Sequence, residues 1–541
     1  MSSSAMLDNF RFPHVEEQEP LGGLLEGILA RYGAPAHVRE DAARLQSKLP
    51  QYRQWAEDAE TNVPRHVQYD HWCRRTDRLV LAHGWEELKK EVAREGMVHY
   101  GYHSATADVG RLHQYTKLFI ASPYMAMVTC PTAMTDGAAT LCRTHGLQEE
   151  FERLTTMDPE KLWMSGQWMT ERPGGSDVGN TETIAEPDGS GGWKVNGFKW
   201  FSSATEADIA FLLARTKVDG QLTPGSRGLS LFLAHVKKPD GSLNGIQIHR
   251  LKNKVGTKSL PTAELLLTDV PAQLIGEPMK GVKNITPILN ITRLHAAMGV
   301  ASYVHRALNL AKSYAETRMA FGKLLKDHVM HAKTLSHLET THRGSTLLIF
   351  HMVNLLGKSE MGDDEAKSVL RLLTPMAKMF VCKVGVHDIV ECMEAMGGQG
   401  YMEETGVGML LRDGIANIIW EGATNVLALD LLRVFDPRFF SEQVTKLVTD
   451  DVVLDELRPQ VKTVQTALNA LMVELQSVDK AELEGMARTL GFSMAQIYIG
   501  ALLVNHTSHI NAHSDFEASR NAAVAWCARL NSTQSSLGAR L

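Results

Sequence analysis

The chain has 541 residues, more than one hydrophobic core supports, so we expect roughly two to four domains. Apolar residues make up 44% and charged residues 22%, the balance of a soluble globular protein. The net charge of -6 excludes a general electrostatic attraction to nucleic acid or anionic membranes. No apolar run approaches the ~18 residues of a membrane span, so a membrane-spanning protein is not expected.

The N-terminus, MSSSAMLDNF, lacks the basic start and apolar core of a secretory signal, so we expect an intracellular protein. Six cysteines are scattered without a CxxC pair, which predicts reduced thiols and no metal site. The chain ends in Ala539-Arg540-Leu541, a tripeptide of the same type as the SKL peroxisomal address. The expected location is therefore the cytoplasm, or the peroxisome if that tripeptide is an address.

The first domain, residues 1–161, is predicted to be helical. Apolar positions recur at helical spacing over 22–32, 36–48 and 85–96. The apolar, methionine-rich stretch 118–141 predicts a buried helix pair, broken near Cys130-Pro131 because proline interrupts a helix.

Composition changes at Leu162, and residues 162–275 predict an all-β domain of barrel or sandwich type. Short β-type runs alternate with turn signals. They occupy residues up to 169, 193–195, 209–214, 229–234, 246–249 and 264–267. The pair Asn196-Gly197 between strand residues predicts a hairpin turn.

Helices return after Thr286 and predict a third domain over 276–435 and a helical extension over 436–541. The next helix shows one apolar face over several turns. That face comprises Leu294, Ala297, Met298, Ala301, Val304, Leu308 and Ala311. Further helical runs end near Gly357 and span 366–396.

The stretch 412–433, RDGIANIIWEGATNVLALDLLR, places one carboxylate, Glu421, among apolar and small residues. Desolvation predicts a raised pKa for this carboxylate and therefore a stronger base. Gly422 permits close approach of a ligand, and Asn425 adds a short polar group. The alternative is a glutamate that only caps the following helix.

Five segments in order resemble the acyl-CoA dehydrogenase flavoprotein family, over roughly residues 162–433. The segments are MTERPGGSDV at 169–178, VNGFKWFSS at 195–203, Arg293 with Arg318 of RMAFGK 25 residues later, GGQGY at 397–401, and Arg412-Asp413 with Glu421 eight residues beyond Asp413. The resemblance implies a mainly α fold with a central all-β domain: a helical N-terminal domain, a β-barrel or sandwich middle domain and a C-terminal four-helix bundle. An extra C-terminal helical module follows here.

The resemblance also implies FAD as cofactor and a set of contact residues. FAD-binding positions are Gln167, Met169, Thr170, Gly175, Ser176, Phe201, Ser203, Arg318, Phe321, Gly397, Gly398 and Asn425. Substrate-binding positions are Ser176, Arg293 and Gly422. Phe201 would cover a flavin face, Ser203 would bond near N5, and Arg318 would reach the FAD pyrophosphate of a neighbouring subunit. Taken singly, the strand with Phe201 and Ser203 is better explained as a hairpin with a buried Phe and a surface Ser. A lone Arg318 is usually a solvated helix charge, and the alternative for Arg293 is a helix-terminal salt bridge.

In this interpretation Glu421 is the general base of an acyl-CoA dehydrogenase. It would remove the α-proton of an acyl-CoA thioester while the β-hydride leaves for flavin N5, giving a trans-2-enoyl-CoA. Backbone and flavin donors to the thioester oxygen would each contribute ~3 kcal/mol.

Several departures from the family pattern resemble its AidB branch. Phe201 replaces the Trp that is usual in the family, Trp420 replaces Tyr, Ala423 replaces Thr, and Glu394 replaces Gln. The added segments 65–70 and 130–135 point the same way. That branch implies a homotetramer, a dimer of dimers, and in its bacterial founder a DNA-binding C-terminal domain. Residues 451–541 carry seven basic and nine acidic side chains, so we do not expect DNA binding here.

Three functions remain open from the sequence. One is a dehydrogenase that passes electrons to an electron-transfer flavoprotein, the second is an acyl-CoA sensor or sequestering protein with weak chemistry, and the third is an oxidase that uses oxygen. The retained Glu421 favours the first. Neither acyl chain length nor the electron acceptor follows from the sequence.

Overall fold

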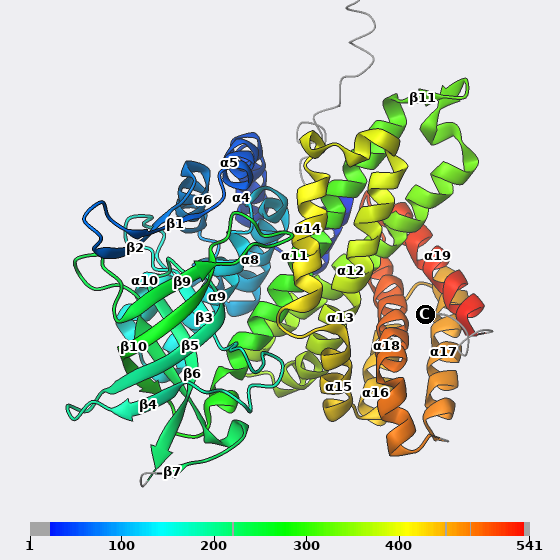
Figure 1. Ribbon diagram of the computed structural model, residues 1–541. Coiled ribbons are helices and arrows are strands. Elements are labelled where there is room, and N and C mark those ends of the chain that lie inside the picture. Colours follow the sequence, from blue (N-terminus) through cyan, green and yellow to red (C-terminus); the bar gives the residue numbers. More distant parts are fainter. Residues whose placement is uncertain (1–21, 219–220, 450–451, 477, 535–541) are drawn as a thin grey trace, which may run out of the picture. The chain divides into compact units, whose positions relative to one another are not determined.

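A computed structural model describes residues 22–218, 221–449, 452–476 and 478–534 (Figure 1). The tripeptide Ala539-Arg540-Leu541 lies outside the described residues. The chain forms two compact units, each described separately below. The β unit comprises Leu49–His103 and Tyr124–His295, and the helical unit comprises the chain before Leu49, Ser104–Pro123 and the chain from Ala296 onward.

The β unit begins with helices and a short hairpin before its main sheet. Its helical elements are α5 (Leu49–Thr61), α6 (His83–Arg94), α7 (Tyr100–His103), α9 (Thr129–His145), α10 (Gln148–Leu154) and η2 (Ser226–Gly228). The hairpin is β1 (Arg65–Tyr69) with β2 (Arg75–Val80). The sequence analysis placed this segment in an all-helical region, and that prediction was wrong. The hairpin consists of alternating, largely polar residues, and its strand β1 lies against β9. The Asp77 carboxylate on β2 accepts the Ile248 N–H of β9 at 3.3 Å.

The main sheet closes on itself, so of the two predicted forms the barrel is present. Its strands are β3 (Ser165–Trp168), β4 (Ile184–Pro187), β5 (Trp193–Ser203), β6 (Ile209–Val218), β7 (Gln221–Leu222), β8 (Leu229–His235), β9 (Ile246–Leu251) and β10 (Thr262–Ile275). The pairs run β6-β4-β5-β10-β8 and return from β8 to β6, with β3 and β7 beside β6 and β9 beside β10. Buried side chains such as Trp168, Leu212, Phe232 and Leu265 fill its core.

The hairpin predicted at Asn196-Gly197 does not exist, because β5 runs straight through both residues. The Asn196 side chain instead bonds Asp269 on the adjacent strand β10, at 3.1 Å to its carboxylate and 2.8 Å from its N–H. A Cβ on Gly197 would lie 2.2 Å from Thr183 Oγ1, so glycine serves close strand packing here. The turn into β5 lies at 188–192, where the Asp188 N–H donates to the Gly192 carbonyl.

The predicted helix break near Cys130-Pro131 lies earlier in the chain. Helix α8 (Ala107–Ala121) ends before η1 (Ser122–Tyr124), and α9 starts at Thr129. Pro131 is therefore the third residue of α9, in the first turn, where its missing N–H leaves no helical hydrogen bond broken. Ala126 and Met127 carry the chain through the bend at φ of 43° and 63°.

The helical unit contains the bundle and the C-terminal module (Figure 1). It includes α3 (Gly22–Arg31), α4 (Ala36–Gln46), α8, α12 (Val329–Glu360), α13 (Asp364–Ala395), α14 (Val407–Ile419), α15 (Thr424–Val434), α16 (Pro437–Val448), α17 (Arg458–Gln476), α18 (Lys480–His509) and α19 (Phe516–Gln534). Helix α11 (Gly281–Thr317) begins in the β unit and continues into this one. The seven predicted apolar positions on α11 are all buried, which confirms that face.

Short elements connect these helices: β11 (Met319–Ala320), β12 (Lys323–Leu324), η3 (Leu325–Asp327), η4 (Gly397–Tyr401), η5 (Glu403–Thr405) and η6 (Asp455–Leu457). Helix α13 packs against α12, α14, α15 and α18. The C-terminal module is fixed to α12 by a buried ion pair, with Arg343 donating to both Asp515 carboxylate oxygens at 2.8 and 2.9 Å.

Helix α18 is long and apolar enough, by length and composition alone, to cross a membrane. Residues Ala481–His509 reach a mean hydropathy of 1.3 over a membrane-length window. That window is 72% buried inside the fold, against α15, α16, α17 and α19. Its apolar surface is therefore covered by protein, as in the central helix of a globular module.

Candidate functional site

Glu421 lies on a tight turn between two helices of the helical unit. Helix α14 ends at Ile419, Trp420 is extended at φ -69° and ψ 163°, and α15 begins at Thr424. Glu421 itself has φ 58° and Gly422 has φ 110°. A left-handed conformation costs a non-glycine residue ~1–3 kcal/mol and persists only where its surroundings impose it. Such strain concentrates at functional sites, which favours a role beyond helix capping.

A buried lysine that the sequence analysis missed lies beneath this turn. Lys378 of α13 is 1% exposed, and its Nζ donates to the Gly422 carbonyl at 2.6 Å. The same Nζ lies 3.5 Å from the Ile418 carbonyl in the last turn of α14. The signal available in the sequence was a single charge within the apolar run TPMAKMF at 374–380.

Three bundle positions predicted to bind FAD, Gly397, Gly398 and Asn425, are exposed. Gly397, at φ 59°, and Gly398 both lie on the surface, and no atom lies within 4 Å of a Cβ placed on either. Asn425 is exposed at the start of α15, where its Oδ1 accepts from Arg488 Nη1 at 3.1 Å. That bond ties the turn to the C-terminal module through α18.

Arg318 and Phe321 lie at an exposed hairpin formed by β11 and β12. Phe321 is 97% exposed at φ 51°, and Met319 and Met330 are 61% and 82% exposed. Monomeric soluble proteins seldom expose such a group of large apolar side chains. The hairpin therefore has the character of an interaction surface.

In the β unit, the glycine-rich signature leaves β3 and folds back on β5. The Trp200 N–H donates to the Thr170 carbonyl at 2.9 Å, which joins the turn to the strand. A Cβ on Gly175 would lie 3.0 Å from Thr170 Oγ1, so these two predicted residues are adjacent. Met169 is half-buried beside them, and Ser176 is exposed on the same turn.

Glu171 within this signature is an anchor whose role the sequence analysis did not state. Its carboxylate is 2% exposed and accepts Lys199 Nζ at 2.6 Å and the Glu182 N–H at 2.6 Å. Lys199 also donates to the Leu213 carbonyl at 2.8 Å. Burial lowers the pKa of Lys199, and the charge of Glu171 opposes that shift. The pair fixes the turn to β5 and, through the Leu213 carbonyl, to β6.

Phe201 and Ser203 occupy the end of β5. Phe201 is 54% exposed, as expected of a side chain available to a planar ligand. The Ser203 hydroxyl bonds Thr262 Oγ1 at 3.0 Å, and Lys254 Nζ donates to that same Thr262 oxygen at 3.0 Å. The Trp168 indole N–H donates to the Ser203 carbonyl at 3.1 Å. Thr262 and Lys254 orient Ser203, and no motif in the sequence pointed to them.

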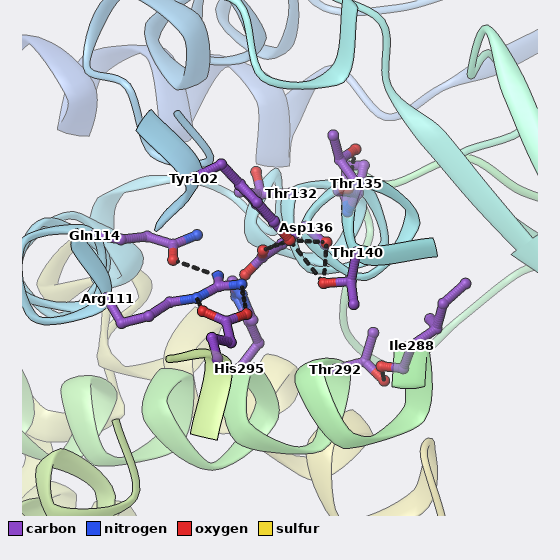
Figure 2. A network of polar contacts seen from close by, with 12 residues as sticks. Tyr102, Arg111, Gln114, Thr132, Thr135, Asp136, Thr140, Ile288, Thr292 and His295 are labelled. Atoms are coloured by element: carbon purple, nitrogen blue, oxygen red, sulfur yellow. Dashed lines mark hydrogen bonds and ion pairs between the residues drawn. The ribbon is translucent and has the colours of Figure 1, made fainter. Parts of the chain in front are cut away.

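Arg293 lies half-buried on α11, two residues before a buried network that Figure 2 shows. Asp136 is fully buried and accepts the Tyr102 hydroxyl at 2.7 Å. Its other oxygen lies 2.8 Å from His295 Nε2. The Tyr102 hydroxyl also bonds Thr140 Oγ1 at 2.8 Å. These bonds connect α11 to α9 and fix the helix that carries Arg293.

The helical unit also contains a cavity of about 580 Å³, lined by residues that include Arg31, His351 and Tyr498. None of the residues predicted for catalysis or cofactor binding lines it. Burial lowers the pKa of His351 to about 3, so this side chain is a neutral hydrogen-bonding group. The cavity is distinct from the Glu421 turn.

Family models match almost the whole chain. They are the adaptive response protein AidB N-terminal domain at residues 22–158 and the acyl-CoA dehydrogenase middle domain at 166–270. The acyl-CoA dehydrogenase C-terminal domain follows at 279–435, and the acyl-CoA dehydrogenase 11 C-terminal domain-like model at 438–539.

Individual proteins similar to this chain are also acyl-CoA dehydrogenases or AidB. Acyl-CoA dehydrogenase family member 11 of Caenorhabditis elegans is 44% identical over 474 residues, covering 83% of this chain and 77% of the relative. The putative acyl-CoA dehydrogenase AidB of Escherichia coli is 28% identical, covering 87% and 83%. The crystal structure of C. elegans ACDH-11 in complex with C11-CoA superposes with a TM-score of 0.90 at 39% identity, covering 95% and 91%. The chain belongs to the acyl-CoA dehydrogenase family, in its AidB-like branch, and has that family's fold with an added C-terminal helical domain.

Proposed function

We propose that this protein dehydrogenates an acyl-CoA thioester to the trans-2-enoyl-CoA, with Glu421 as the general base. The observation that carries the proposal is the turn at Glu421, where a carboxylate is held at φ 58° beside Gly422 and above the buried Lys378. A base must be held within reach of the proton that it removes, and a strained, anchored turn provides that constraint.

FAD is the cofactor of the acyl-CoA dehydrogenase family, and the β unit offers groups that fit it. Gln167 Oε1 is buried and has no hydrogen-bond partner among the described residues, so an acceptor is available beside the signature. Thr170 and Ser176 supply hydroxyls on a turn kept open by glycine, and Phe201 presents an exposed aromatic face. When bound, FAD supplies the acceptor for the β-hydride.

The protein's own residues supply the acid–base part of the reaction. The α-proton passes from the substrate carbon to the Glu421 carboxylate, which holds it until product leaves. Gly422 carries no side chain, so a thioester can approach the backbone of the turn. Ser203 is held by Thr262 and Lys254 as a rigid hydroxyl for cofactor contact. Phe201 would exclude water from one face of the bound ring.

For partners, we propose acyl-CoA as substrate, an electron-transfer flavoprotein as electron acceptor and a homotetramer as the assembly. The C. elegans relative was solved with C11-CoA, so medium-length acyl-CoAs are the first substrates to test. The exposed Met319 and Phe321 of the hairpin, with Met330 at the start of α12, support burial of this surface against another copy. Light scattering on the purified protein measures the assembly, and a monomer would contradict it.

The first experiment is an anaerobic titration of the purified flavoprotein with acyl-CoAs of increasing length, followed by the visible absorbance of the flavin. Bleaching by one chain-length class supports dehydrogenation. A perturbed spectrum without bleaching would indicate binding without turnover and would contradict the proposal.

Two variants test the proposed roles of Glu421 as general base and of Ser203 as a cofactor contact. Glu421→Gln is expected to lower the rate of bleaching by at least ~10²–10⁴-fold while FAD stays bound. Ser203→Ala is expected to weaken FAD binding and to slow the reaction less. Equal losses in the two variants would contradict this division.

A further inference from the structure

Lys378 is a charged residue buried in the helical unit. The middle of α13 around it is apolar, and its side chain is 1% exposed. Removing an ammonium group from water is costly unless protein acceptors replace the water. Here the Gly422 carbonyl at 2.6 Å and the Ile418 carbonyl at 3.5 Å are two such acceptors. The lysine therefore contacts the backbone on both sides of Glu421.

Both carbonyls belong to a backbone that the two helices do not fix by themselves. The last carbonyls of α14 have no partner within the helix, and the helix end carries a partial negative charge that favours a cation. Glu421 and Gly422 then turn through positive φ before α15 begins. Without an external donor, nothing in ordinary helix geometry would favour this conformation for Glu421.

We infer that Lys378 is a positioning residue: by holding the carbonyls of Ile418 and Gly422, it fixes the orientation in which Glu421 presents its carboxylate. The inference rests on the proposed function of Glu421. Lys378 exchanges no proton with the substrate. It acts through the backbone, so its loss leaves the base present but poorly oriented.

The test compares the FAD-loaded wild type with Lys378→Met, which has a similar length and no donor. Lys383→Met is the matched control, because Lys383 is exposed on the same helix. The first measurement is hydrogen exchange of peptides that cover 418–424. We expect exchange ~10-fold faster or more in Lys378→Met and unchanged in Lys383→Met, because only the first loses the anchor.

The second measurement is single-turnover flavin reduction with an acyl-CoA that bleaches the wild type, unlabelled and deuterated at the α-carbon. A base displaced by ~1 Å loses ~10²-fold in rate. We therefore expect Lys378→Met to slow reduction by about 30- to 100-fold, with a larger isotope effect and a Kd for acyl-CoA within about 3-fold of wild type. A merely structural role would not enlarge the isotope effect.

Exchange and reduction rates within about 3-fold of wild type in Lys378→Met would overturn the inference, as would a loss of melting temperature with unchanged exchange at 418–424. If Lys378→Met does not fold, Lys378→Gln, which keeps an N–H donor, is measured in the same way. Glu421→Gln separates the two claims. If that variant still turns over, the proposed function is wrong, and the exchange data alone decide whether Lys378 holds the turn.

Discussion

The buried pair of Lys199 and Glu171 allows a quantitative test of what holds the glycine-rich signature in place. Lys199→Met keeps the volume of the side chain but leaves the Glu171 carboxylate, 2% exposed, without its cation. Breaking a buried ion pair in this way costs ~3–5 kcal/mol. For a unit of this size that cost corresponds to a fall in melting temperature of roughly 6–20 °C.

The double variant Lys199→Met/Glu171→Gln makes the test specific. A glutamine oxygen can still accept the Glu182 N–H that Glu171 accepts at 2.6 Å, and no buried charge remains. We therefore expect the double variant to recover ~2 kcal/mol or more of the loss. Thermal unfolding and flavin retention are measured on both variants and on Lys194→Met, an exposed lysine on the same strand. A double variant no more stable than Lys199→Met would refute the explanation by an unpaired charge.

Two further predictions concern packing and pH. Gly197→Ala would place its Cβ 2.2 Å from Thr183 Oγ1 and should lower unfolding stability by ~1–3 kcal/mol, whereas Gly485→Ala, which meets no atom within 4 Å, should not. Equal melting temperatures for the two variants would contradict this. Burial lowers the pKa of His305 from 6.5 to about 4. The His305 Nδ1 atom lies 3.0 Å from His342 Nε2. The unfolded chain therefore binds the proton first, so stability is lost as pH falls from 6.5 towards 4, by ~2 kcal/mol between pH 7 and 5. Melting curves of wild type and His305→Gln measure this slope, and an unchanged slope in the variant would contradict the assignment.

Much of the fold follows from local patterns because periodicity and composition are local properties. The apolar face of α11, the helices α12 and α13, and six of the eight strands of the main sheet were predicted from local patterns, whereas β4 and β7 were not. The errors have a common cause. Asn196-Gly197 has the residue types of a turn, but Thr183 and Asp269 from other strands select an extended conformation there. No local rule contains those partners.

For the candidate site too, the sequence pattern identified the candidate residues but not the groups that hold them. Spacing and motif order singled out Glu421, Thr170, Ser203 and Arg318, and the family assignment rests on residues visible in the sequence. The specific catalytic and cofactor roles of these residues, the domain boundaries and the location of the protein in the cell stay predictions. Pattern alone could not show which groups hold the candidate residues in place.

The sequence by itself determined the family, most of the helices and strands, and the residue that is the candidate base. Only the tertiary structure decided how these groups are held: Lys378 reaches the Glu421 turn from 43 positions earlier in the chain, and Lys199 reaches Glu171 from 28 positions later. These two lysines become buried and find their acceptors only because segments distant in the chain meet in the fold. For that reason the anchors of these two turns are properties of the fold, while the candidate functional residues can be read from the sequence.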